Sequence, residues 1–190
     1  MFVSMNWIQE FVDLSGENIE SLIKRFTLST AEVEDIIYKG KEVQGVIIAQ
    51  IVSVENHPNS KKLHLLKVDT GSGIVDCVCG APNVEVGQKV AFAPVGSHVV
   101  GMEITEAKVA GYVSQGMCCG EDELGISDDH TGLMVIDSDA PLGTDIKSIY
   151  AIDDIIFEVD NKSLTNRPDL WGHYGIAREF AVIAKQYQGA

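Results

Sequence analysis

The sequence predicts an α+β fold in which a small β-rich barrel or sandwich is inserted into a discontinuous α/β domain built from both chain ends. Residues 41–150 contain the short runs VIIAQIVSV, LHLLKVD, IVDCVCG and KVAFAPV, separated by breaks rich in Gly and Pro. Regular short strands separated by Gly- and Pro-rich turns are typical of β-barrels and β-sandwiches. Residues 1–40 and 151–190 instead show helical periodicity, and each end alone lacks a partner for its apolar faces.

The first segment, residues 1–40, predicts two helices followed by a strand. Ser4 is expected to cap the first helix, whose apolar face consists of Trp7, Ile8, Phe11 and Val12. The SGE stretch at 15–17 ends it, and a second helix is marked by Ile19, Leu22, Ile23 and Phe26. EVEDIIYKG, from Glu32, predicts a strand that leads into a glycine turn.

The last segment, residues 151–190, predicts the strand DIIFEVD and one long helix over 166–187. Asn166 is the expected cap, Pro168 suits the first turn, and Asp169 lies at the positive end of the helix dipole. The expected apolar face consists of Leu170, Tyr174, Ala177, Phe180, Ala181 and Ala184.

Composition limits the classes of function. The chain has 190 residues, 45% of them apolar, and 28 acidic against 14 basic residues give a net charge of −14. Nucleic-acid-binding proteins usually carry a basic surface, which argues against non-specific capture of nucleic acid by the free chain and against DNA as a partner. Because the sequence has neither a membrane-length apolar run nor a signal-peptide pattern, we expect a cytoplasmic chain without membrane contact.

No metal site is expected. In a cytoplasmic chain the four cysteines, Cys77, Cys79, Cys118 and Cys119, are expected to be buried thiols, with a zinc site built from both pairs as the alternative. A metal shared by His57 and His64 is a second alternative. The acidic stretch 121–130 lacks the ligand pattern of a calcium loop and is expected to be a solvated turn.

No catalytic residues are predicted, because the chain contains neither a phosphate-binding glycine loop nor a nucleophile elbow. Charged residues do gather near the start of the last helix, and a domain or subunit contact is the expected role of Arg178 and Glu179. Acid–base chemistry by Asp169 and His173 is the catalytic alternative.

The stretch NHPNSKKLHLLKVDTGSG, residues 56–73, predicts a strand, a turn at Pro58 and Asn59, and a returning strand. Lys61 and Lys62 are expected to be exposed on the turn. Phosphate contact and simple solvation both remain open for these lysines.

Four segments carry a resemblance to a known family: HPNSKKLHLLKVD (57–69), VCGAPNVEVGQKVAFAPVGS (78–97), AKVAGYVSQGMCCGEDELGISDDHTGLMVI (107–136) and APLGTD (140–145). In this order they resemble the EMAP-type tRNA-binding domain, a five-stranded OB-fold β-barrel. The flanking SMNWIQEFVDL, FTLSTAEVEDI and SLTNRPDLWGHYGIAREFA resemble the N-terminal region of the β subunit of bacterial phenylalanyl-tRNA synthetases. In that family the OB-fold domain is inserted into a domain made from the flanking segments, here residues 1–40 and 151–190.

The resemblance implies part of an ATP- and magnesium-dependent ligase of two α and two β subunits, with catalysis in the α subunit, tRNA as a partner, and no cofactor in this fragment. The hypothesis places tRNA contacts at His57, Asn59, Lys61, Lys62 and Asn83. It places subunit or domain contacts at Asn166, Arg167, Asp169, Arg178 and Glu179. The alternative function is a free-standing OB-fold module that binds tRNA or acts like a chaperone.

Charge sets the strength expected of any tRNA contact. Residues 41–150 contain seven lysines and fifteen acidic residues, a net charge of −8. Because phosphate contacts from Lys and Arg supply most non-specific affinity, an acidic barrel is expected to bind tRNA weakly.

Overall fold

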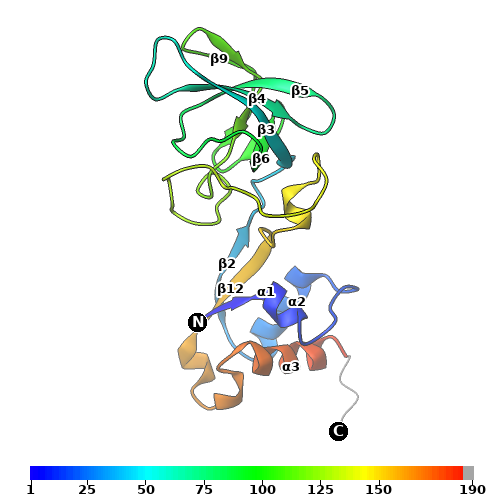
Figure 1. Cartoon of the computed structure of the whole chain (residues 1–190). Helices are drawn as coiled ribbons and strands as arrows, with labels where there is room; N and C mark the ends of the chain where they lie inside the picture. The colour runs from blue at the N-terminus through cyan, green and yellow to red at the C-terminus, as the bar shows by residue number, and fades with distance from the viewer. Residues whose placement is uncertain (186–190) are drawn as a thin grey trace. The chain divides into compact units, whose positions relative to one another are not determined.

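The computed structural model describes residues 1–185, and the chain divides into two compact units. Unit 1 comprises Met1–Lys39 and the described residues from Asp154 onward, whereas unit 2 comprises Gly40–Asp153. Unit 2 therefore interrupts unit 1 in the sequence, as the colours along the ribbon show (Figure 1).

A three-stranded antiparallel sheet organises unit 1. Its central strand is β12 (Asp154–Val159), which pairs with β1 (Phe2–Ser4) on one side and β2 (Val33–Lys39) on the other. Val3 lies opposite Phe157, and Lys39 lies opposite Asp154. The chain therefore leaves and re-enters unit 1 at neighbouring backbone positions, which is the geometry that an inserted domain requires.

Three helices complete unit 1: α1 (Met5–Gln9), α2 (Ile19–Ser29) and α3 (His173–Ile183) (Figure 1). Ser4 caps α1 as expected, because its Oγ accepts a hydrogen bond from the Trp7 amide at 3.1 Å. Three aromatic rings from α2, β12 and α3 meet in the core, with the Phe26 and Phe180 centroids 5.3 Å apart and Phe157 edge-on to both. No helix among residues 1–185 is both long and apolar enough to cross a lipid bilayer.

The single helix predicted over 166–187 is wrong. Pro168–Leu170 forms the short 3-10 helix η3, the chain turns at Trp171 and Gly172, and α3 begins only at His173. The residue before η3 is Arg167, without a side-chain cap, so Asn166 is not the predicted cap. This turn brings the Asp169 carbonyl close to the backbone of Gly175, which is possible because Gly175 has no Cβ to overlap the oxygen. The predicted end of the helix at 186–187 lies outside the described residues.

The predicted apolar faces of the first and last helices are also partly wrong. In α1 the buried residues are Met5 and Ile8, whereas the Trp7 side chain is 52% exposed. Tyr174 on α3 is 63% exposed. Trp7 stacks on His173 with ring centroids 4.1 Å apart. Because α1 ends at Gln9, after little more than one turn, the predicted Phe11 lies beyond the helix, where helical spacing no longer decides burial, and it is 49% exposed.

Unit 2 is a five-stranded antiparallel sheet with the strand order β11-β6-β3-β4-β5. These strands are β3 (Ile47–Asn56), β4 (His64–Asp69), β5 (Ile74–Cys79), β6 (Lys89–Pro94) and β11 (Gly116–Cys118). A register shift between Ile51 and Ser53 marks a bulge in β3, which increases the coiling that a small barrel needs. The edge strands β5 and β11 meet through the Gln115 amide and the Asp76 carbonyl at 2.8 Å, so the sheet nearly closes. The predicted OB-fold barrel is confirmed.

The two most central barrel strands bury both of their faces. Ala49 and Ile51 of β3 belong to the barrel core, whereas Ile48 belongs to a second core beneath the connecting segments. Residues of β6 alternate between the same two cores. This explains why VIIAQIV and KVAFAP read as continuous apolar runs without alternation. Shorter elements of this unit are β7 (His98–Val99), β8 (Met102–Glu103), β9 (Ala107–Val109), β10 (Tyr112–Ser114) and the 3-10 helix η1 (Ile146–Ser148).

In unit 1, we expect Gly175→Ala to lower the free energy of unfolding by about 1–3 kcal/mol, because the added methyl group overlaps the Asp169 carbonyl. Gly172→Ala is the matched control: its backbone is extended and a Cβ there would meet nothing within 4 Å. Urea unfolding monitored by tryptophan fluorescence follows unit 1 selectively, since Trp7 and Trp171 both lie in it. Equal effects of the two substitutions would contradict this packing.

The same assay distinguishes buried from exposed apolar residues. Leu170 is 1% exposed, so Leu170→Ala is expected to cost about 2–5 kcal/mol. Trp7→Ala removes a half-exposed ring and its stack on His173, and is expected to cost about 1 kcal/mol. A larger loss of stability for Trp7→Ala than for Leu170→Ala would show that this assignment of the core is wrong.

Candidate nucleic-acid interface

Two loops of the barrel come together beside strands β4 and β5. The five barrel strands in chain order are β3, β4, β5, β6 and β11, and the loops are named by this order. Loop 1–2 (residues 57–63) joins the first strand, β3, to the second, β4. Loop 4–5 (residues 95–115) joins the fourth strand, β6, to the fifth, β11, and contains the β9–β10 hairpin. In OB-folds the face of the second and third strands, together with these two loops, binds oligonucleotides and oligosaccharides. This end of the barrel is therefore the candidate nucleic-acid interface.

His57 joins the two loops. The Asn59 amide donates to its Nδ1 at 3.1 Å, so this nitrogen is unprotonated and Nε2 carries the hydrogen. Nε2 in turn donates to the Ala110 carbonyl of the β9–β10 hairpin at 3.2 Å. The ring also lies edge-on to Tyr112, with centroids 5.0 Å apart. His57 is only 4% exposed, so its role in the structure is to shape loop 1–2 and fix it to loop 4–5.

The other predicted tRNA-contact residues lie in two places. Asn59, Lys61 and Lys62 are exposed on loop 1–2, as the strand–turn–strand prediction required. Asn83 lies apart from them, after β5. Its side-chain amide donates to the Leu133 carbonyl at 3.0 Å and accepts from the Leu133 amide at 2.8 Å. Both polar ends of Asn83 are therefore used to hold the segment at Leu133.

A groove of about 240 Å³ runs beside the two loops. Its lining residues come from β3, β4, β5 and β10 and include Glu55, Leu65, Lys67, Asp76, Tyr112 and Val113. Lys67 donates to Asp76 at 2.9 Å, and this hydrogen bond raises the pKa of Lys67. The groove thus contains a satisfied ion pair and an aromatic ring, but no net positive charge to attract a phosphate, since Glu55 and Asp76 outnumber Lys67.

Sequence reasoning missed two residues of this region, Lys108 on β9 and Tyr112 on β10. Lys108 is exposed, and Tyr112 is 41% exposed. An exposed aromatic ring is the kind of side chain on which single-stranded bases stack in nucleic-acid-binding proteins. The Ala110–Gly111 pair, with φ of 49° and 97°, is the local signal for a tight hairpin, but its contact with His57 could not be read from sequence.

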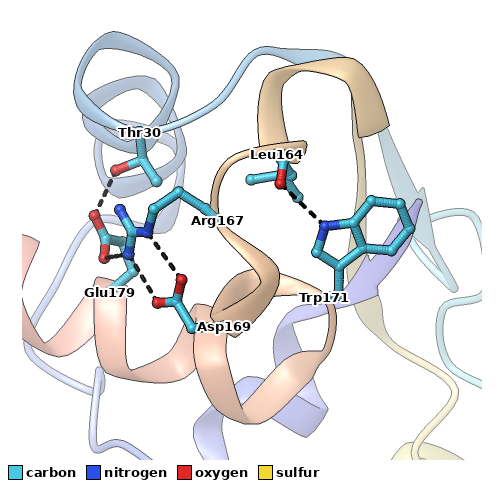
Figure 2. A network of polar contacts seen from close by, with 6 residues as sticks. All are labelled: Thr30, Leu164, Arg167, Asp169, Trp171 and Glu179. Atoms are coloured by element: carbon cyan, nitrogen blue, oxygen red, sulfur yellow. Dashed lines mark hydrogen bonds and ion pairs between the residues drawn. The ribbon is translucent and has the colours of Figure 1, made fainter.

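The second predicted group, near η3 and α3, forms a network within unit 1 (Figure 2). Arg167 donates two hydrogen bonds of 2.9 Å to Asp169 and one of 3.2 Å to Glu179. Glu179 also accepts from the Thr30 hydroxyl at 2.7 Å. Arg167 lowers the pKa of Asp169 through the paired hydrogen bonds. Three of the five predicted contact residues therefore hold η3, α3 and the end of α2 together.

The remaining two predicted contact residues, Asn166 and Arg178, are exposed. Trp171, which follows η3, donates from its indole Nε1 to the Leu164 carbonyl at 3.1 Å while its ring stays 54% exposed (Figure 2). The outer surface of this end of unit 1 thus presents an amide, a guanidinium and an indole ring.

Asp169 and His173 do not form the acid–base pair considered as the catalytic alternative. Asp169 is bound to Arg167, whereas His173 accepts a hydrogen bond from the Ser4 amide at its Nε2, at 3.0 Å. Partial burial lowers the pKa of His173. The two side chains therefore serve separate structural contacts. Within residues 1–185, no group of three or more His, Cys, Asp or Glu side chains has the arrangement needed to hold a metal ion.

The barrel, its two loops and the order of its motifs define the class of protein. A family model described as a putative tRNA binding domain matches residues 46–145, and the chain belongs to that family.

Similarity to curated proteins extends beyond the barrel into both chain ends. The phenylalanine–tRNA ligase beta subunit of Leptospira interrogans is 39% identical over 183 residues, which is 95% of this chain and 23% of that protein. The beta subunit of Fusobacterium nucleatum is 38% identical over 184 residues, with 96% and 23% coverage, and that of Aromatoleum aromaticum is 39% identical over 187 residues, with 98% and 23%. The resemblance identified from the sequence is thus confirmed, and the chain spans about a quarter of the length of these relatives.

The His57 contact gives a prediction for the free chain. His57→Ala is expected to accelerate hydrogen exchange at the Asn59 amide, because that amide loses its acceptor, and to loosen the β9–β10 hairpin. Exchange measured by NMR or mass spectrometry checks this. Lys61→Ala, an exposed change in the same loop, is the control and should leave the protection of Asn59 unchanged. Unaltered exchange in His57→Ala would contradict the role assigned to the ring.

Proposed function

We propose that this chain is the N-terminal, non-catalytic part of a phenylalanine–tRNA ligase β subunit. The observation that carries the proposal is similarity to such subunits across 95–98% of the chain, covering unit 1 as well as the barrel. On this proposal the complete enzyme contains two α and two β subunits, and the α subunit catalyses the ATP- and magnesium-dependent joining of phenylalanine to tRNA. The fragment itself would hold no cofactor.

Within that assembly, the proposed role of unit 2 is contact with tRNA through loop 1–2 and the β9–β10 hairpin. Lys61, Lys62 and Lys108 would supply the phosphate contacts, and Tyr112 a surface for stacking. His57 would act indirectly, by holding loop 1–2 against the β9–β10 hairpin. Asn83 would act at a distance, by fixing the segment at Leu133.

The proposed role of unit 1 is subunit or domain contact through its exposed residues, with Asn166 and Arg178 as the contacting side chains. Arg167, Asp169 and Glu179 would support that surface by fixing η3 against α3. The rival function, a free-standing tRNA-binding module, leaves unit 1 without a purpose. The hydrophobic core and the polar network of unit 1 would then have no role in the function of the protein.

A salt titration of the 190-residue chain with purified tRNA tests the tRNA contact. We expect weak binding whose logarithm falls linearly with the logarithm of salt concentration, with a slope of about −2 to −3 if the three lysines each neutralise a phosphate. Lys61→Ala/Lys62→Ala should reduce the magnitude of this slope by about 2.

The matched control is Lys24→Ala/Lys162→Ala, which removes the same charge from exposed positions of unit 1. It should leave the slope almost unchanged. Equal losses in both double variants would indicate general electrostatic attraction, and absence of binding at low salt would remove tRNA contact from the proposal.

A further inference from the structure

The groove beside loops 1–2 and 4–5 contains two cross-strand pairs on the outer face of the barrel. Leu65 of β4 lies opposite Val78 of β5. The next pair on this face is Lys67 opposite Asp76, because the residues that alternate with these on both strands belong to the barrel core. The floor of the groove therefore has an apolar half and a charged half side by side.

Tyr112 of the β9–β10 hairpin also lines this groove. Its ring is 41% exposed and packs edge-on against the buried ring of His57, which fixes the hairpin through the Ala110 carbonyl. A ring held in this way loses little freedom when a planar ligand stacks on it. The groove thus offers an apolar floor and an aromatic surface to one planar group.

Size and charge decide which part of a nucleic acid can enter the groove. At about 240 Å³ it is smaller than the usual pocket of about 300–1,000 Å³ for a drug-sized ligand, so it admits one ring system. The carboxylates of Glu55 and Asp76 outnumber the ammonium of Lys67, so a phosphate is repelled. Phosphates would instead lie outside, at exposed lysines such as Lys108, the cross-strand partner of the groove residue Val113. A neutral base is the part that fits.

The position of Asp76 is fixed by the seam of the barrel. Its carbonyl accepts from the Gln115 amide at 2.8 Å, where β5 meets the segment that leads into β11. Two residues further along β5, the Val78 amide donates to the Ser114 hydroxyl at 3.0 Å. On the other side, the Lys67 Nζ donates to the Asp76 Oδ1 at 2.9 Å. A carboxylate held in this way needs little ordering to bind a ligand.

The Lys67–Asp76 pair discriminates among bases through its hydrogen-bonding groups. The ammonium only donates and the carboxylate only accepts. The matching base edge therefore carries an acceptor directly beside two donors. Guanine has this pattern, with O6 next to N1–H and the 2-amino group. Cytosine and adenine offer the carboxylate only one amino group, and uracil offers one N–H between two carbonyl oxygens.

From this arrangement we infer that the groove binds one unpaired guanine of RNA, with Tyr112 as the stacking surface and Lys67 and Asp76 as the specificity-determining residues. Asp76 accepts from N1–H and the 2-amino group, and Lys67 donates to O6. Proteins that read RNA sequence usually do so at unpaired bases, on this edge and with an aromatic ring against the base. Such a base preference rests on the proposed tRNA contact.

The test is binding of the 190-residue chain to three short oligouridylates at low salt, measured by fluorescence anisotropy. The three RNAs differ only in the central nucleotide, which is guanosine, inosine or uridine. Inosine keeps O6 and N1–H but lacks the 2-amino group. We expect the guanosine RNA to bind about tenfold more tightly than the uridine RNA, with the inosine RNA between them.

Three variants separate the parts of the groove. Asp76→Asn should abolish the preference for guanosine, because the amide replaces one acceptor with a donor. Tyr112→Ala should weaken binding of all three RNAs by about tenfold without changing their order, since stacking tolerates any base. Tyr112→Phe keeps the ring and should bind like the unaltered chain. The matched control is Glu85→Gln, which removes one negative charge from an exposed residue outside the groove and should keep the preference.

Equal affinity for the guanosine and uridine RNAs would overturn the inference and leave the proposed tRNA contact standing. A preference that survives Asp76→Asn would do the same, as would binding of purified tRNA without binding of any of the three RNAs. Failure to bind both tRNA and the three RNAs at low salt would remove the tRNA contact and the guanine site together.

Discussion

The pairing of β12 with β1 and β2 is the interaction on which the rest of the structure depends. It joins strands that are more than a hundred residues apart in the sequence and places the residue after unit 2 opposite the residue before it. Without β12, Phe157 would be missing from the core that Phe26 and Phe180 share. Because closing so long a loop costs entropy that increases only slowly with its length, an inserted barrel is tolerated where the strand pairing is strong.

The proposed function depends on a second contact between distant segments, the one between loops 1–2 and 4–5. The neutral His57 ring fixes the position of the lysine-bearing loop, although His57 itself is buried. A buried histidine that positions exposed lysines is consistent with an acidic chain that contacts nucleic acid at one place only. The few lysines are held in a defined geometry, whereas the net charge of −14 prevents strong non-specific attraction of nucleic acid to the rest of the chain.

Unit 1 shows how charged residues near a helix start can be needed for the fold as well as for a partner. Arg167 donates three hydrogen bonds, two to Asp169 and one to Glu179, and Glu179 links α3 to Thr30 at the end of α2 (Figure 2). The network links η3 to α3 and to the end of α2. It leaves Asn166, Trp171 and Arg178 on the outside, where the proposed assembly contact would find a preformed surface.

The sequence by itself determined the α+β class, four of the five barrel strands, the Ser4 cap and the family, because strand runs, caps and motif order are local signals; the short strand β11 gave no such run. It also located the exposed lysines of loop 1–2, since a Pro-Asn turn between two strands must lie on the surface. Only the tertiary structure decided that Trp7 is exposed, that the last helix breaks before His173, that His57 is buried under the β9–β10 hairpin, and that Cys77 meets Cys118. Each of these depends on contacts between segments far apart in the chain, such as Gly175 packed on the Asp169 carbonyl or β5 facing β11, and no local periodicity encodes which distant atoms will meet.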